Sequence, residues 1–138
     1  MSTASANDFV VVDTNVISFV IKGDTRAALY QPHLGGRLQI IAAQTCAELE
    51  PWTLVHNWNQ PRRAALHAYL KDFIFIEADE SVCLLWAKVQ ASARKQGHPI
   101  SVSDAWIAAT ALVYDVPLVT HNPADFKNVR GLKVITEK

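Results

Sequence analysis

The feature that most constrains the fold of this chain is a series of short, mostly apolar, β-rich runs. They occupy residues 9–12, 38–41, 73–77 and 118–120, and a last run at 133–136 is a candidate edge strand. Strands that are apolar on both faces are typical of sheets covered by helices on both sides. Because helical stretches separate these runs, the sequence predicts an α/β sandwich with a mainly parallel sheet.

Helical patterns fill the intervals between the runs. Helices are expected directly after Asp13, over residues 25–34, from Thr45, over 61–71, over 80–96 and from Ser103. Glycine closes three of them, at Gly23, at Gly35-Gly36 and at Gly97. Thr45 with Glu48 three residues later has the spacing of a capping box. Pro51 follows soon after, and it marks either a kink or a boundary.

The length of 138 residues suits a single domain. Residues 1–8 are small and polar, so we expect them to form a disordered tail and residues 9–138 to form the domain. No apolar run reaches the ~18–20 residues that a membrane-spanning helix needs, so no membrane association is expected. The first residues also lack a signal-peptide pattern, and the cytoplasm is therefore the expected location.

Charge and cysteine content narrow the possible partners and cofactors. The 13 basic and 13 acidic residues give a formal net charge of zero, which argues against a protein that coats nucleic acid through broad positive charge. Contact with nucleic acid then requires a local basic rim around an acidic pocket. Cys46 and Cys83 stand in neither a CxxC nor a CxxH pattern, so neither a zinc site nor a disulfide framework is expected.

Acidic residues stand at the ends of the predicted elements. Asp13 follows the first strand, Asp125 follows the strand at 118–120, and Glu48 and Asp104 lie in the first turns of helices. Right-handed crossovers carry these positions to one edge of a parallel sheet, where ligands bind. Four carboxylates that meet there repel each other strongly unless a cation neutralises them. The sequence therefore predicts a metal site that all four acids share.

The ligand types at these positions indicate which metal would bind. Carboxylates without Cys or His partners suit a hard cation, Mg²⁺ or Mn²⁺, better than zinc. One such ion can activate water and hold a phosphodiester oxygen, and two ions can stabilise both the attacking and the leaving oxygen. This chemistry predicts phosphodiester hydrolysis without a protein nucleophile.

Each acid also has a purely structural interpretation. Asp13 is a preferred helix cap, and Glu48 can close the capping box. Asp104 can serve the helix dipole, and Asp125 can be a turn residue. Helix caps and metal ligands occupy the same positions, so it is the order of the four acids together that indicates a site.

The order of the acids and the sequence around them resemble PIN domains, and within them the VapC-like toxins of bacterial and archaeal toxin–antitoxin pairs. The resemblance extends from Val10 to about Ile135. It is carried by residues 11–18 (VVDTNVIS), 44–49 (QTCAEL), 100–112 (ISVSDAWIAATAL), 118–126 (LVTHNPADF) and 128–134 (NVRGLKV).

The resemblance implies a three-layer α/β/α sandwich with a five-stranded parallel sheet. It also implies an endoribonuclease that depends on Mg²⁺ or Mn²⁺, with one or two ions bound, and that forms a homodimer. A cognate antitoxin would insert a short helix or extended peptide beside the site, block it and join the toxin in a larger assembly. Free toxin would inhibit translation until it is neutralised.

The resemblance also assigns roles to individual positions. The three core acids are Asp13, Glu48 and Asp104. The polar residues that orient the site are Thr14, Asn15 and Thr120. Some relatives have a further acid where this chain has Asn122, and others resemble it in having that acid at Asp125. We expect Asp125 to be the fourth acid, with Asn122 assisting.

A substrate RNA needs positive charge at the rim of an acidic site. The candidates flank the acids in sequence and are Arg94, Lys95, His98, Lys127 and Arg130. Single-stranded or looped RNA is expected, because splayed bases can enter a small site. His121 either contacts phosphate or packs against its neighbours. Packing in the core or at an interface is expected for the four tryptophans, Trp52, Trp58, Trp86 and Trp106.

Other functions compete with an RNA nuclease. A phosphatase-like hydrolase with Asp13 as nucleophile is disfavoured, because one common type has a second Asp two positions later, where this chain has Asn15. Two further alternatives stay open: a PIN fold that serves as a non-catalytic protein-binding module, and a DNA nuclease of related fold.

Overall fold

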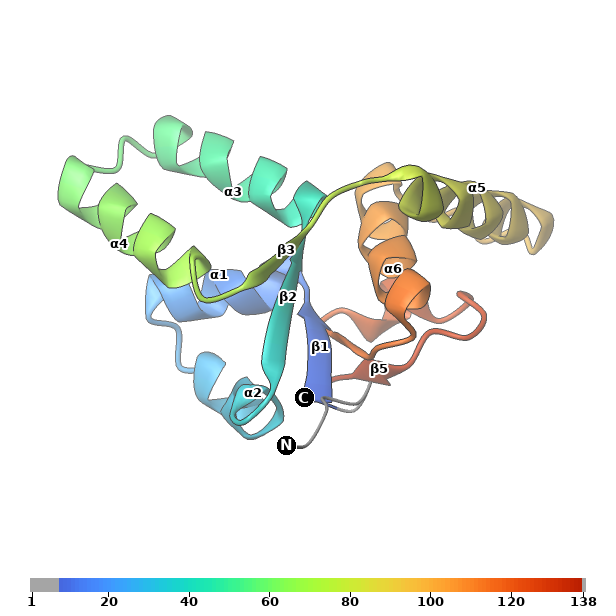
Figure 1. The fold of residues 1–138 in the computed structure, drawn as a ribbon, viewed down its shortest axis with the longest axis horizontal. Helices are drawn as coiled ribbons and strands as arrows, with labels where there is room; N and C mark the ends of the chain where they lie inside the picture. The colour runs from blue at the N-terminus through green and yellow to red at the C-terminus, as the bar shows by residue number, and fades with distance from the viewer. Residues whose placement is uncertain (1–7, 138) are drawn as a thin grey trace.

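A computed structural model of the chain describes residues 8–137. Five strands form one sheet in the order β3-β2-β1-β4-β5, and each neighbouring pair is parallel (Figure 1). The strands are β1 (Phe9–Val12), β2 (Leu38–Ala42), β3 (Ile74–Ile76), β4 (Leu118–Val119) and β5 (Val134–Ile135). The predicted parallel sheet is confirmed, and all five expected runs contribute a strand.

Helices cover both faces of this sheet and give the molecule three layers (Figure 1). Their bounds are α1 (Thr14–Lys22), α2 (Ala27–Leu34), α3 (Ala43–Val55), α4 (Gln60–Leu70), α5 (Glu80–Lys95) and α6 (Val102–Tyr114), and a short 3-10 helix, η2 (Pro123–Phe126), follows β4. Helices α1 to α4 lie on one side of the sheet, and α5 and α6 lie on the other. The predicted α/β/α sandwich is therefore confirmed.

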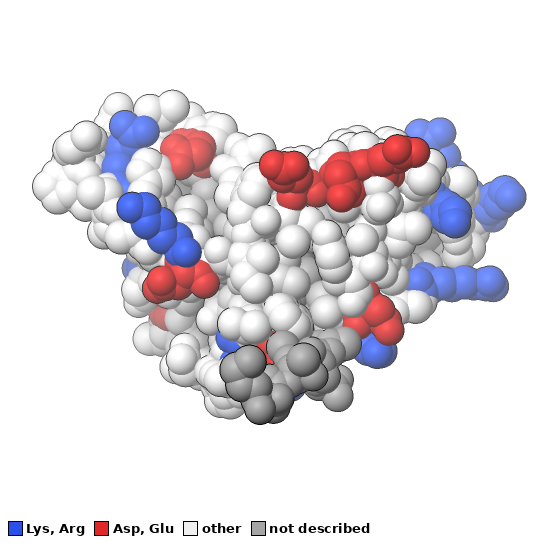
Figure 2. All heavy atoms as spheres, viewed as in Figure 1, with Lys and Arg blue, Asp and Glu red and all other residues white. Residues whose placement is uncertain are grey.

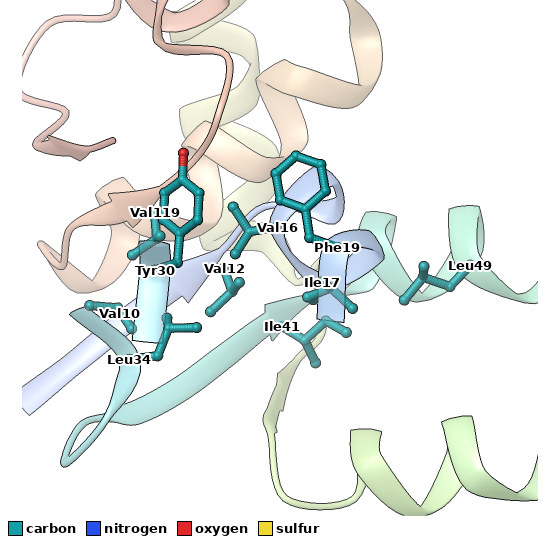
Figure 3. Close-up of a cluster of buried hydrophobic side chains, with 10 residues drawn as sticks. All are labelled: Val10, Val12, Val16, Ile17, Phe19, Tyr30, Leu34, Ile41, Leu49 and Val119. Carbon is teal, nitrogen blue, oxygen red and sulfur yellow. The ribbon is translucent and has the colours of Figure 1, made fainter. Parts of the chain in front are cut away.

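Strand β1 lies in the middle of the sheet and supplies side chains to both cores. Val10 and Val12 pack with side chains of α1, α2 and α3 on one face (Figure 3). Val11 points to the other face and packs against α6. All three valines are almost completely buried. Since successive side chains of a strand alternate between faces, a strand with helices on both sides must be apolar throughout.

The expected capping box at Thr45 and Glu48 is wrong. Helix α3 begins at Ala43, directly after β2, and its N-cap Ala42 makes no side-chain hydrogen bond. Thr45 is instead completely buried inside the first turn, with its hydroxyl 3.0 Å from the hydroxyl of Thr14. A contact between two helices has replaced the local cap that the sequence suggested.

The structure also decides the question left open at Pro51 and moves one helix start. Helix α3 continues past Pro51, so this proline does not mark a boundary. Helix α6 begins at Val102, one residue before the expected start at Ser103. Its cap is Ser101, whose hydroxyl accepts a 3.1 Å hydrogen bond from the backbone N–H of Asp104. A serine before the first turn is a favoured N-cap.

The expected disordered tail at residues 1–8 lies outside the described residues, apart from Asp8. Between residues 8 and 137, no helix combines the length and the hydropathy needed to cross a membrane.

Phe126 anchors η2 to the sheet face that α6 covers, and only 2% of its surface is exposed. We expect Phe126→Ala to lower the free energy of unfolding by about 3–5 kcal/mol, because it removes a buried ring and leaves a cavity. Urea denaturation measures this loss. Phe75→Ala is the matched control: Phe75 is 52% exposed, so its loss should cost only about 1 kcal/mol. Equal losses would contradict the core role of Phe126.

Candidate active site

Asp13 is the most deeply buried of the four acids predicted to form the site, with 5% of its surface exposed. It follows β1 and caps α1, where its Oδ1 accepts a 2.7 Å hydrogen bond from the backbone N–H of Thr14. Its Oδ2 accepts another 2.7 Å bond from the hydroxyl of Thr120. The two donors fix the orientation of the carboxylate, which is therefore a helix cap and a rigid acidic group at once.

The pairing of β1 with β4 brings the second donor to Asp13. The backbone N–H of Asp13 continues the hydrogen bonding between the two strands, at 2.9 Å. The hydroxyl of Thr120, which follows β4, also accepts a 3.1 Å bond from the backbone N–H of Asn122. The backbone N–H of His121, between these two residues, donates a 3.3 Å hydrogen bond to Oδ1 of Asn15. The segment after β4 is thereby fastened to the start of α1.

Glu48 approaches the same edge of the sheet from α3 and is largely exposed. The hydroxyl of Thr14 lies 3.3 Å from Oε1 of Glu48 and 3.0 Å from the hydroxyl of Thr45. A hydroxyl has one proton to donate, so Thr14 can serve either acceptor. Thr14 consequently links the start of α1 to the acid on α3.

Asp104 lies half-buried in the first turn of α6. The residue before it, Ser103, accepts a 2.9 Å hydrogen bond from the side-chain amide of Gln44. Gln44 lies one helical turn before Glu48 on α3, so this bond fastens together the two helices that carry Glu48 and Asp104. A hydrogen bond with Ser103 also lowers the pKa of Glu48, although burial outweighs it.

The four acids influence one another electrostatically. Burial raises the pKa of Asp13 to about 6, its two hydrogen bonds oppose the rise, and the charges of Asp104 and Glu48 add to it. Burial also raises the pKa of Glu48, with a further contribution from Asp104. Burial and the nearby charge of Asp125 raise the pKa of Asp104. Asp13, Glu48 and Asp104 therefore influence one another, and Asp125 is linked to them through Asp104.

Asp104 and Asp125 line a hollow of about 360 Å³ between the end of α5, the start of α6 and η2. Of the basic residues considered for the rim, His98 and Lys127 line the same hollow. Arg130 lines a different one, beside α5. The remaining two candidates, Arg94 and Lys95, form the last turn of α5. The acids therefore have positive groups beside them even though the chain as a whole is neutral.

The donor set suits a hard cation. Within residues 8–137, no three His, Cys, Asp or Glu side chains stand close enough to form a ready-made coordination site. The side chains gathered here nevertheless offer carboxylate and hydroxyl oxygens, the ligands that Mg²⁺ and Mn²⁺ prefer. Burial, and to a smaller extent repulsion between the acids, raises the pKa of three of them, and a bound cation would favour their charged forms.

The structure assigns packing contacts to His121. Its ring meets Phe19 edge-on with centroids 5.1 Å apart, and its Nδ1 forms a short hydrogen bond with the hydroxyl of Tyr30. The same hydroxyl accepts a 3.2 Å bond from the backbone N–H of Glu137. Of the two roles considered for His121, these contacts favour packing over phosphate binding.

The tryptophans form two pairs that are only half-buried. Trp86 and Trp106 stack with their ring centroids 5.1 Å apart, and Trp52 and Trp58 contact each other at the same distance. A cation covers each ring of the second pair: Lys22 lies over Trp52, and Arg62 lies over Trp58. Packing between elements is thus their observed role, although none belongs to the fully buried core.

Three polar residues near the acids were absent from the predicted site: Gln44, Thr45 and Ser103. The sequence did hold a signal for them, because each lies within a segment that carries the resemblance, at most four residues from an acid. Their roles depend on partners on other helices, and the spacing of the acids gave no reason to select them.

The fold and the site together define a class of protein: a parallel α/β sandwich with several carboxylates gathered near the carboxyl ends of its central strands. A protein-family model described as "PIN domain" matches residues 10–132. Since this match covers most of the chain, the protein belongs to the PIN domain family.

Individual relatives agree with this assignment. The chain is 29% identical over 126 residues to "Ribonuclease VapC1" of Haemophilus influenzae strain R2866, which covers 89% of this chain and 93% of the relative. A solved structure of VapBC-1 from nontypeable Haemophilus influenzae matches with a TM-score of 0.77 and 25% identity, covering 93% of this chain and 97% of that one. VapBC2 from Rickettsia felis, bound to a promoter DNA fragment, has the same fold, with a TM-score of 0.83 at 18% identity over 94% and 99% of the two chains.

The raised pKa of Asp13 makes the stability of the metal-free protein depend on pH. Its pKa is higher in the folded state, about 6, than the ordinary 3.8, so the folded state binds the proton more tightly. The stabilisation is complete below about pH 4 and is lost as the pH rises through about 6, at a total of about 3 kcal/mol. We therefore expect Asp13→Asn to be more stable than the wild type at neutral pH in chelator.

Urea denaturation across this pH range, with chelator present, checks the expected difference. Asp72→Asn is the matched control, because Asp72 is exposed and lies on the turn between α4 and β3. If Asp13→Asn loses stability at neutral pH, or shows the same pH dependence as the wild type, the pKa of Asp13 is not raised in the folded protein.

Proposed function

We propose that this PIN domain is a metal-dependent endoribonuclease that hydrolyses phosphodiester bonds in single-stranded or looped RNA. The observation that carries the proposal is the burial of Asp13 in a rigid hydrogen-bonded setting, together with the charges of Glu48 and Asp104 that raise its pKa. The ribonuclease name of the 29% identical relative supports RNA as the substrate. A carboxylate buried this deeply beside two other acids is poorly explained by a helix-capping role alone.

The side chains divide the work of such a site. Asp13, Glu48, Asp104 and Asp125 would hold one or two Mg²⁺ or Mn²⁺ ions, and the bound metal would activate water and stabilise charge on the phosphodiester. Thr14 and Thr120 orient Asp13 through the backbone and the side chain respectively. Asn15 accepts a hydrogen bond from the backbone N–H of His121, and the backbone N–H of Asn122 donates to the hydroxyl of Thr120. Both bonds hold the segment after β4 in place.

We further propose that the protein is the toxin of a toxin–antitoxin pair, acting in the cytoplasm as a homodimer. Its resemblance to VapC-like toxins and its likeness to the solved VapBC-1 structure support this role. A cognate antitoxin would then block the acidic site, with an arginine as the natural partner for clustered carboxylates. Purification of the protein with the product of a neighbouring small gene, and recovery of nuclease activity when that product is removed, would test the pairing.

Cleavage of single-stranded RNA with Mg²⁺ or Mn²⁺ tests the proposed activity. We expect Asp13→Asn to reduce cleavage by at least about 100-fold, because it removes a charge from the metal site while it preserves shape. Asp72→Asn should cleave like the wild type. Chelator should abolish cleavage by the wild-type protein.

Persistent cleavage by Asp13→Asn, or by the wild type in excess chelator, would refute this mechanism. Two comparisons separate the alternatives. Faster cleavage of single-stranded DNA than of RNA of the same sequence would favour a DNA nuclease. Absence of cleavage with either polymer, in protein freed of any partner, would favour a non-catalytic binding module.

A pair of variants tests the identity of the fourth acid. The charge of Asp125 contributes to the raised pKa of Asp104, whereas the hydrogen bond recorded for Asn122 involves its backbone N–H. We therefore expect Asp125→Asn to lower the cleavage rate by about 10-fold or more and Asn122→Ala to lower it less. Single-turnover cleavage rates measure both, and the reverse order would transfer the role to Asn122.

A further inference from the structure

We propose that the hollow beside Asp104 and Asp125 holds the nucleotide next to the scissile bond, with Lys127 binding its phosphate. This inference rests on the proposed function, because it assigns the ligand to the substrate RNA. It adds a binding site and a positioning residue to that function.

The hollow has the size and chemistry that a nucleotide requires. Its volume of about 360 Å³ falls within the range of small-molecule sites. Ile100 and Val129, which line the hollow and also pack against the core, offer apolar surface for a base, and Asn128 on the same lining carries an amide that can hydrogen-bond to one. Asp104 and Asp125 lie on the same lining, so a nucleotide bound here would be in contact with two of the acids.

Lys127 places a positive charge on the lining that carries Asp104 and Asp125, where it can offset their repulsion of an RNA phosphate. Four carboxylates repel an RNA phosphate as well as one another, so substrate binding requires a cation close to the acids. Lys127 is the one Lys or Arg among the described residues that line the hollow. It forms no ion pair with residues of the described chain, unlike Arg26, which is paired with Asp24 at 2.8 Å. Its charge is therefore available to a ligand.

Further basic residues continue outward from this position. His98 lies on the lining of the hollow, three residues beyond the end of α5. Helix α5 itself ends with Arg94 and Lys95. Figure 2 shows Lys and Arg side chains gathered at the end of the molecule where α5 projects. Phosphates on one side of the bound nucleotide can follow this positive surface away from the acids.

Binding of a fluorescein-labelled single-stranded RNA in chelator tests the inference without requiring cleavage. Each lysine–phosphate contact changes the slope of log affinity against log salt by ~0.7 for a single strand. We therefore expect Lys127→Gln to bind RNA about eightfold more weakly at roughly 50 mM salt, with a correspondingly smaller salt slope. Lys127→Arg should retain most of the affinity.

Lys71→Gln is the matched control. Lys71 and Lys127 are both exposed, and both are C-cap residues in right-handed helical conformation, but Lys71 closes α4 at a distance from the hollow. Its removal should leave both affinity and salt slope unchanged. Thermal unfolding of each variant verifies that the fold is intact.

The outcomes separate this inference from the proposed function. Wild-type affinity and salt slope in Lys127→Gln would overturn the inference while cleavage could persist. Weaker RNA binding by Lys127→Gln, with no cleavage by any variant in Mg²⁺ or Mn²⁺, would support phosphate binding by Lys127 but would refute the nuclease, and with it the place of the hollow beside a scissile bond. Failure of the wild type to bind RNA, or an equal effect of Lys127→Gln on binding of a poly-glutamate peptide, would also overturn it.

Discussion

The hydrogen bond from the Thr120 hydroxyl to the buried carboxylate of Asp13 joins the two strands on which the site is built. It places an acid at the junction of β1 and β4, where parallel strands end side by side. Water is largely excluded there, so the carboxylate keeps its charge only at an energetic cost, which appears as a pKa of about 6. The charges of Asp104 and Glu48 add to that cost, and the surrounding hydroxyl and amide contacts hold these acids together.

Much of the fold could be predicted because the chain must be apolar wherever a strand is covered on both sides. The apolar run at residues 9–12 predicted a buried strand, and in the sheet this strand pairs with a neighbour on each edge. The start of α3 could not be predicted in the same way. Ala42 ends β2 and caps α3 with extended backbone alone, and no side-chain signal marks such a junction.

The candidate site was partly predictable for a related reason. The four candidate acids were selected from their places at element ends and from the resemblance. In the structure, the charges of Asp104 and Glu48 raise the pKa of Asp13, and the charge of Asp125 raises that of Asp104. The residues that brace them were harder to find. The contact between Thr14 and Thr45 spans 31 positions and the bond between Gln44 and Ser103 spans 59, and such pairings depend on how helices settle against the sheet.

The division of β1 between two separate cores has a consequence for how this protein can diverge. Val10 and Val12 serve one core and Val11 the other, so away from the place where α3 meets α6 the helices on the two faces are separated by the strands between them. Substitutions that reshape one helical layer therefore have little mechanical effect on the other, since distant residues without shared partners act independently. A lineage can accordingly remodel the outer surface that meets other molecules while the strand ends that carry the acids keep their spacing.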